Sequence, residues 1–139
     1  MAGKTIAIVD DEPHIVDMLS TFLQIKGYRT CSADSGEKVL VLLQLEQPDA
    51  LLLDLMLPDI DGFEVLARLR AAPDYAKLPV LIVSARTDLA SKTRAEQAGA
   101  NGYFTKPVRM PDLIAALERL LNSPPAAPPA SASSSPESG

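Results

Sequence analysis

Four apolar segments of this chain each lead into a polar residue that phosphoryl-transfer chemistry can use. The segments 6–9 and 51–53 run into carboxylates, while 80–83 and 103–105 run into a hydroxyl and an ammonium group. The polar residues are Asp10, Asp11, Asp54, Ser84 and Lys106. If the four segments are parallel strands of one open sheet, these side chains meet in the crevice at the carboxyl ends of the strands. The spacing therefore predicts a single site with three carboxylates, one hydroxyl and one ammonium.

The three carboxylates suit a divalent cation. Mg²⁺ prefers oxygen ligands, takes one or two protein carboxylates and keeps several waters. Asp10, Asp11 and Asp54 supply the carboxylates, and the backbone carbonyl of Met56, two residues beyond Asp54, offers a further oxygen. Capping of the next helix needs only one Asp, so it explains neither the adjacent pair nor Asp54. Like charges this close repel one another unless a cation lies between them, which favours a Mg²⁺ site at these four residues.

The same residues have the chemistry to form an aspartyl phosphate. A carboxylate can attack phosphorus and become a covalent intermediate, and Asp54 is the candidate nucleophile. Phosphoryl transfer depends mainly on positioning and on neutralising the charge of the phosphoryl oxygens. Lys106 can act there as a point charge, and the hydroxyl of Ser84 can donate a hydrogen bond.

Five strand-like segments alternate with five segments of helical periodicity. The strands are expected at 5–9, 28–33, 50–53, 80–83 and 103–105, and the helices at 13–25, 35–45, 63–71, 88–98 and 111–121. Short β–α units force parallel pairing, and right-handed crossovers place helices on both faces. The chain is therefore predicted to be an α/β protein with a five-stranded, parallel, doubly wound sheet.

The apolar pattern also predicts where elements lie and which faces they bury. Segment 51–53 has no polar alternation, so it is expected near the centre of the sheet, and 28–33, the least apolar, at an edge. The inward face of the first helix is expected to carry Ile15, Met18, Leu19, Phe22 and Ile25. That of the second is expected to carry Val39, Leu40, Leu42 and Leu43. Asp61 is expected to cap the third helix.

Composition limits the function classes. The 139 residues carry a formal charge of −5, which argues against direct nucleic-acid binding because phosphate backbones favour a basic surface. No apolar run reaches the roughly 18 residues that span a membrane, and no signal-peptide core precedes the first strand. A cytoplasmic protein is expected. A single cysteine, Cys31, excludes an internal disulfide and a multi-cysteine metal site.

The composition changes near residue 122. Residues 122–139 contain five prolines, six serines and four alanines, a composition that cannot bury enough apolar surface to fold. The expected organisation is one domain over 1–121 followed by a disordered tail or linker over 122–139.

The motifs resemble those of the response-regulator receiver family, of which the chemotaxis regulators are members. The matching runs are Val9-Asp10-Asp11-Glu12-Pro13, the run from Leu53 to Gly62, Val83-Ser84-Ala85 and Lys106-Pro107. Their order and spacing match over about residues 4–121. The resemblance implies the flavodoxin-like strand order 2-1-3-4-5 and a signalling protein of a two-component or phosphorelay pathway, not a turnover enzyme.

The resemblance also implies roles for individual residues. Asp54 would accept a phosphoryl group from a sensor histidine kinase or a histidine phosphotransfer protein, with Mg²⁺ held by Asp10 and Asp11. Ser84 and Lys106 would contact the phosphoryl group, and the peptide bond before Pro107 would be cis. Ser84 and Tyr103 would switch the surface 88–121. That surface would bind a downstream protein or a fused output domain, or form a phosphorylation-dependent dimer.

Three alternatives make different predictions. A flavodoxin-like cofactor binder needs a small-residue phosphate loop after the first strand, where this chain has Asp-Asp-Glu. A phosphatase with an aspartyl nucleophile commonly has a second Asp two residues further on, where this chain has Met56. A pseudo-receiver, which is never phosphorylated and acts only as a protein-interaction module, would not need these chemical residues.

Overall fold

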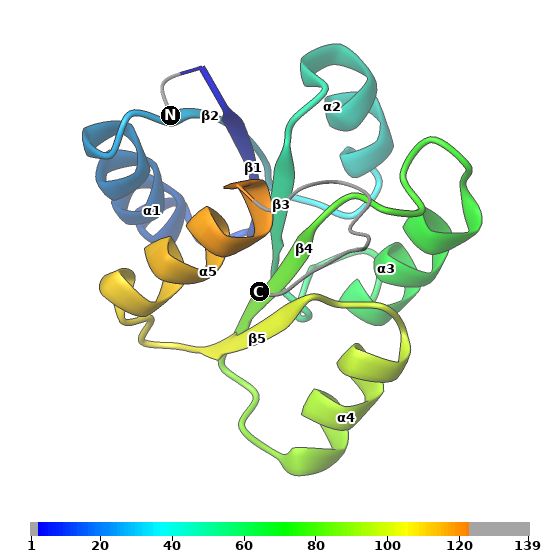
Figure 1. Cartoon of the computed structure of the whole chain (residues 1–139). Helices are drawn as coiled ribbons and strands as arrows, with labels where there is room; N and C mark the ends of the chain where they lie inside the picture. The colour runs from blue at the N-terminus through cyan, green and yellow to red at the C-terminus, as the bar shows by residue number, and fades with distance from the viewer. Residues whose placement is uncertain (1–2, 123–139) are drawn as a thin grey trace, which may run out of the picture.

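One parallel sheet forms the centre of the computed structural model, which describes residues 3–122. Its strands are β1 (Thr5–Val9), β2 (Arg29–Ala33), β3 (Ala50–Leu53), β4 (Val80–Ser84) and β5 (Gly102–Thr105). They lie in the order β2-β1-β3-β4-β5, and every neighbouring pair is parallel. The predicted strand order is confirmed, with β3 in the middle and β2 at an edge (Figure 1).

Five helices cover the two faces of the sheet. They are α1 (Pro13–Ile25), α2 (Val39–Glu46), α3 (Gly62–Ala71), α4 (Leu89–Gln97) and α5 (Met110–Asn122). The helices α1 and α5 pack on one face, and α2, α3 and α4 pack on the other (Figure 1). The doubly wound α/β architecture predicted from the alternating segments is confirmed.

Successive strand residues contribute to two separate cores. Leu52 packs with α1 and α5, while its neighbours Leu51 and Leu53 pack with the helices of the opposite face. All three side chains are buried, as side chains on both faces of a covered parallel sheet must be. This double burial explains why the strand segments read as continuous apolar runs.

The predicted apolar face of α1 is partly wrong. Phe22 and Ile25 were expected to be inward, but their exposed fractions are 46% and 74%. Leu19 and Leu23 are the buried residues of this helix. The inward face therefore turns toward Leu23, and Phe22 and Ile25 lie on its flank.

The second helix begins four residues later than predicted. The helix α2 starts at Val39, because the backbone N–H groups of Gly36 and Glu37 donate to the carboxylate of Asp59 instead of entering a helix. Leu40 was expected to be inward but is 40% exposed.

The last helix extends one residue beyond the predicted domain boundary. Asn122, expected to begin the tail, is the final residue of α5. The rest of the predicted tail, 123–139, lies outside the described residues. Within residues 3–122, no helix is both long enough and apolar enough to cross a membrane.

Candidate functional site

The register of the sheet brings the predicted site residues together at the carboxyl ends of the strands. Val9 pairs with Leu53, so Asp10 and Asp54 follow side by side on β1 and β3. Ser84 is the last residue of β4 and pairs with Thr105, directly before Lys106. The parallel register of the strands is therefore sufficient to bring the side chains of Asp10, Asp54, Ser84 and Lys106 together.

Three carboxylates converge at this edge. Oxygens of Asp10, Asp11 and Asp54 all lie within 4.8 Å of one another. Asp10 and Asp54 are 3% and 4% exposed, while Asp11 faces solvent. Carboxylates on the strand ends, open to water on one side, are the donor set that a hard divalent cation such as Mg²⁺ prefers.

Lys106 lies against this carboxylate cluster. Its Nζ is 2.8 Å from Asp10 Oδ2, 3.0 Å from Glu12 Oε1 and 3.2 Å from Asp54 Oδ2. Burial disfavours the charged amine, but the hydrogen bonds to Asp10 and Glu12 outweigh burial and raise the pKa of Lys106. The lysine is therefore a permanent positive charge beside Asp54. The peptide bond between Lys106 and Pro107 is cis.

Burial raises the pKa of Asp54 above its ordinary value. The backbone N–H of Met56, which donates to Asp54 Oδ1 at 3.1 Å, and the ammonium of Lys106 oppose this shift. The same lysine holds the pKa of Glu12 below its ordinary value, through a hydrogen bond and its charge. Two oxygens of Asp54 thus have different partners, a backbone amide on one and an ammonium on the other.

Ser84 and Tyr103 lie on the other side of the crevice. The hydroxyl of Ser84 is fully buried and accepts a hydrogen bond from the backbone N–H of Arg86 at 3.2 Å. Tyr103 is half-buried on β5, and its hydroxyl donates to the carbonyl of Arg86 at 2.9 Å. Lys92 of α4 lies over the tyrosine ring, with Nζ 5.9 Å from its centre. The loop after β4 therefore connects the serine to the tyrosine through the backbone of one residue.

The loop after β3 is fixed where it enters α3. Asp61 caps this helix as predicted, accepting from the N–H of Phe63 at 2.8 Å. Gly62 lies against the backbone that carries Asp54. A Cβ at Gly62 would be 2.6 Å from the Asp54 carbonyl oxygen and 2.5 Å from Leu55 Cα, so this position has no room for a side chain.

The sequence prediction assigned no role to three residues that shape the site. Glu12 bonds Lys106, and Asp59 connects the β3–α3 loop to the chain before α2. Gly62 permits the close approach to Asp54. Glu12 follows the two aspartates directly, so its position was a usable signal. The partners of Asp59 are distant in the chain, and those of Gly62 are backbone atoms. No sequence pattern points to either set of contacts.

Comparison with known proteins gives relatives of one kind. The family model for the response regulator receiver domain matches residues 6–118. The transcriptional regulator RpaA of Synechocystis is 40% identical over 116 residues, which cover 84% of this chain and 48% of that protein. KdpE of Mycobacterium tuberculosis is 39% identical over 112 residues, covering 81% of this chain and 48% of KdpE. The chain thus spans about half the length of the curated relatives it matches.

Solved structures give the same result. A putative response regulator from Chloroflexus aurantiacus superposes with a TM-score of 0.82 at 36% identity, covering 86% of this chain and 98% of that one. The chemotaxis protein CheY4 of Vibrio cholerae superposes with a TM-score of 0.80 at 30% identity, covering 86% and 100%. With the matched residues reaching from β1 into α5, this chain belongs to the response regulator receiver domain family.

Proposed function

We propose that this receiver domain is switched by phosphorylation of Asp54. The observation that carries the proposal is the position of Lys106, whose Nζ is 3.2 Å from Asp54 Oδ2 in a crevice that also holds Asp10 and Asp11. A buried carboxylate beside a fixed ammonium and two further carboxylates has a nucleophile and the means to neutralise incoming charge.

The proposed donor is a phosphohistidine on a sensor histidine kinase or a histidine phosphotransfer protein. An oxygen of Asp54 forms a bond to phosphorus as the phosphorus–nitrogen bond of the donor breaks, and the imidazole nitrogen keeps that electron pair. Lys106 then pairs with one phosphoryl oxygen, and the hydroxyl of Ser84 donates to another. No general base is needed, because the attacking carboxylate has no proton to lose.

Mg²⁺ fits the carboxylates of this site. Asp10, Asp11 and Asp54 would hold the ion, and the carbonyl of Met56 would complete its protein ligands. The bound ion supplies positive charge to the phosphoryl oxygens. Because Lys106 already faces the carboxylates of Asp10, Glu12 and Asp54, a second cation is required before another anionic group can enter.

The proposed output is a change in the surface 88–121. Ser84 moves toward the phosphoryl group, and Tyr103 turns inward from its bond to the Arg86 carbonyl. Phosphorylation shifts a population between these two arrangements. A downstream protein, an output domain fused in a longer chain or a second receiver would recognise the change.

The location and partners remain predictions. RpaA is described as DNA-binding, but this chain spans about half of it. The net charge of −5 supports the prediction that these 139 residues do not contact nucleic acid directly. A cytoplasmic location is also proposed, because members of the receiver domain family are typically cytoplasmic. The role is signalling, and loss of the phosphoryl group by hydrolysis would return the domain to its resting state.

Nuclear magnetic resonance of the chain with beryllofluoride, a phosphoryl mimic, and Mg²⁺ tests the proposal. We expect the mimic to change the chemical shifts of backbone amides near Asp54 and also across 88–121. In Asp54→Asn it should change none of them. Chemical-shift changes near Asp54 without any change in 88–121 would contradict the proposal that phosphorylation alters this surface. A folded chain that binds neither the mimic nor Mg²⁺ would support the pseudo-receiver alternative.

A further inference from the structure

The helix α2 is apolar around most of its circumference. Its sequence is Val-Leu-Val-Leu-Leu-Gln-Leu-Glu, yet within it only Val39 and Leu43 are buried. Val41 and Leu45 are 56% and 75% exposed. A helix that is apolar on all sides normally packs against other protein on all sides. The outer face of α2 therefore has the composition of an interface.

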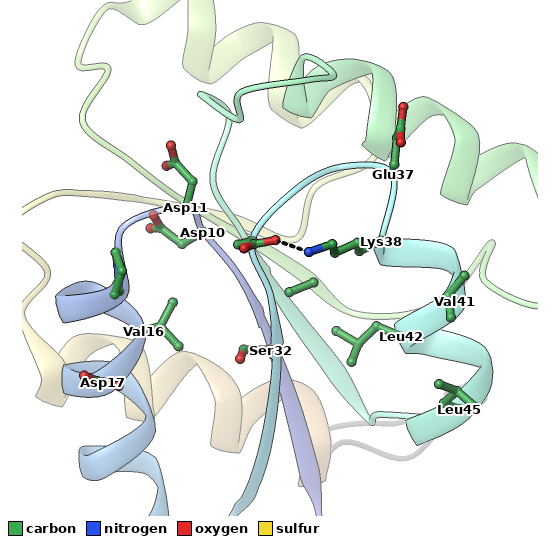
Figure 2. A pocket seen from close by; sticks show the side chains of 13 residues that line it. Asp10, Asp11, Val16, Asp17, Ser32, Glu37, Lys38, Val41, Leu42 and Leu45 are labelled. Atoms are coloured by element: carbon green, nitrogen blue, oxygen red, sulfur yellow. Dashed lines mark hydrogen bonds and ion pairs between the residues drawn. The ribbon is translucent and has the colours of Figure 1, made fainter.

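This outer face forms one wall of a groove with a volume of about 700 Å³. Val41, Leu42 and Leu45 line it from α2, and Pro13 and Val16 line it from α1. Figure 2 shows the two helices on either side of β2, with Val16 and Leu42 pointing into the space between them. The groove lies along the edge strand β2, and Val41 and Leu45 are exposed in it.

The rim of the groove is acidic. Asp11 and Asp17 lie on the α1 side, and Asp34 and Glu37 lie on the α2 side; all four are exposed. Among the groove-lining residues, the only cation is Lys38, which is already paired with Asp34 at 2.8 Å. A ligand that fills the groove must therefore present apolar side chains to its walls and positive charges to its rim.

Neither a second copy of this chain nor its own segment 123–139 offers apolar side chains together with positive charges. A second copy would bring the same acidic rim and a net charge of −5, so the two surfaces would repel each other. The segment 123–139 of this chain contains one glutamate and no lysine or arginine. Neither complements a groove bordered by four carboxylates.

We infer that the α1–α2 groove docks a basic amphipathic helix of a partner protein. A groove between two helices accepts a third helix through side chains at positions i, i+3, i+4 and i+7. The eight residues of α2 extend about 12 Å, which matches two to three turns of such a helix. Leu45 and Val41 provide the apolar contacts, and Glu37 and Asp17 pair with lysines or arginines on its flanks.

The test uses a defined peptide and the full chain, with no phosphoryl donor, so its outcome is independent of the proposed phosphorylation. The probe is a labelled 14-residue peptide of leucine and lysine, with leucines at helical spacing, measured by fluorescence anisotropy. One control replaces every lysine with glutamate. The other has the same composition but alternates leucine and lysine, which gives the period of a strand. We expect the helical lysine peptide to bind most tightly.

Variants locate the binding surface. Leu45→Ser should weaken binding about tenfold, since a newly buried leucine contributes about one factor of ten or more. Glu37→Gln should weaken it about two- to threefold, and the loss should shrink at high salt. Leu89→Ser is the matched control, because Leu89 is 77% exposed on α4, far along the chain from the groove. All three positions are exposed, so the fold should be retained, which thermal unfolding checks.

Three outcomes would overturn the inference. The glutamate peptide could bind as tightly as the lysine peptide, or the alternating peptide could bind more tightly than the helical one. The third is that Leu45→Ser leaves the affinity unchanged while Leu89→Ser reduces it, which would place binding on another surface. Tight binding of the helical lysine peptide that only Leu45→Ser and Glu37→Gln weaken supports the inference.

Discussion

Lys106 and Asp54 are joined across an intervening strand. Lys106 follows β5 and Asp54 follows β3, and β4 lies between them, yet Nζ is 3.2 Å from Oδ2. The lysine also contacts Asp10 at 2.8 Å, so one side chain ties three strands together at their carboxyl ends. Its side chain is only 13% exposed. The contact is therefore shielded from water on most sides, unlike a surface ion pair.

Replacing Lys106 should destabilise the domain when no metal is present. In Lys106→Met, the carboxylates of Asp10 and Asp54 lose their common cation, and the free energy of unfolding should fall by about 3 kcal/mol. Mg²⁺ should restore part of that loss, because it binds the same carboxylates. Urea unfolding with and without Mg²⁺ measures both effects. The exposed Lys77 provides the control Lys77→Met, which should change little. Equal stability of Lys106→Met and the native chain without metal would show that the ion pairs of Lys106 with Asp10 and Asp54 do not stabilise the domain.

Met56 should prolong the life of the phosphorylated state. Its side chain is 57% exposed beside Asp54 and has no group that can orient an attacking water. The phosphoryl group should therefore be lost several-fold faster from Met56→Asn, whose amide can hold a water. Phosphate release after removal of the donor gives both rates. Met56→Leu, which remains apolar, should decay as slowly as the native chain. Equal or slower decay in Met56→Asn would show that this side chain does not control hydrolysis.

Gly62 should tolerate no side chain. In most helices a change from glycine to alanine stabilises by about 1 kcal/mol. Here the new Cβ would lie 2.6 Å from the Asp54 carbonyl oxygen, so Gly62→Ala should instead destabilise by about 1–3 kcal/mol and displace Asp54. Ala67→Gly, at an exposed position of the same helix, measures the difference in helix propensity between alanine and glycine without a steric clash. A Gly62→Ala protein that is more stable and phosphorylated at the native rate would contradict the close approach.

Asp59 should make the free energy of unfolding depend on pH in the acidic range. Backbone N–H groups of Glu37 and Gly36 donate to its carboxylate and hold the pKa of Asp59 below its ordinary value of 3.8. Since the unfolded chain then binds the proton more readily, the contribution is complete above the unfolded pKa and is lost as the pH falls through the folded one.

Urea unfolding between about pH 6 and pH 3 should therefore show a smaller loss of stability in Asp59→Asn than in the native chain. The amide keeps an acceptor for one of the two N–H groups but does not titrate. Asp74→Asn is a control, because the exposed Asp74 lies in the α3–β4 loop, away from Gly36. Identical pH dependence in Asp59→Asn and the native chain would contradict the link between these loops.

Much of the fold followed from the sequence for a physical reason. Strands such as β3 are buried on both faces, so their apolar runs are unmistakable, and parallel pairing then places Asp10, Asp54, Ser84 and Lys106 together. Features set by contacts between distant segments were not predictable. The helix α2 starts at Val39, and its start depends on Asp59, which lies twenty residues further along the chain.

The errors of burial have a similar origin. Phe22, Ile25 and Leu40 are apolar and were expected to be inward, but each is exposed. Periodicity assigns apolar residues to a face without measuring how wide the covered face is. In α2 the apolar residues surround the helix, and only the packing of the sheet decides which of them are buried.

The intact mass of the chain after incubation with a small acyl-phosphate donor shows whether Asp54 accepts a phosphoryl group. It is measured with and without Mg²⁺, on the native chain and on Asp54→Asn. We expect one added phosphoryl group that requires Mg²⁺ and does not appear on Asp54→Asn. Equal addition to both proteins, or none to a folded native chain with Mg²⁺ present and a rapid quench, would contradict the assignment of Asp54 as the phosphoryl acceptor.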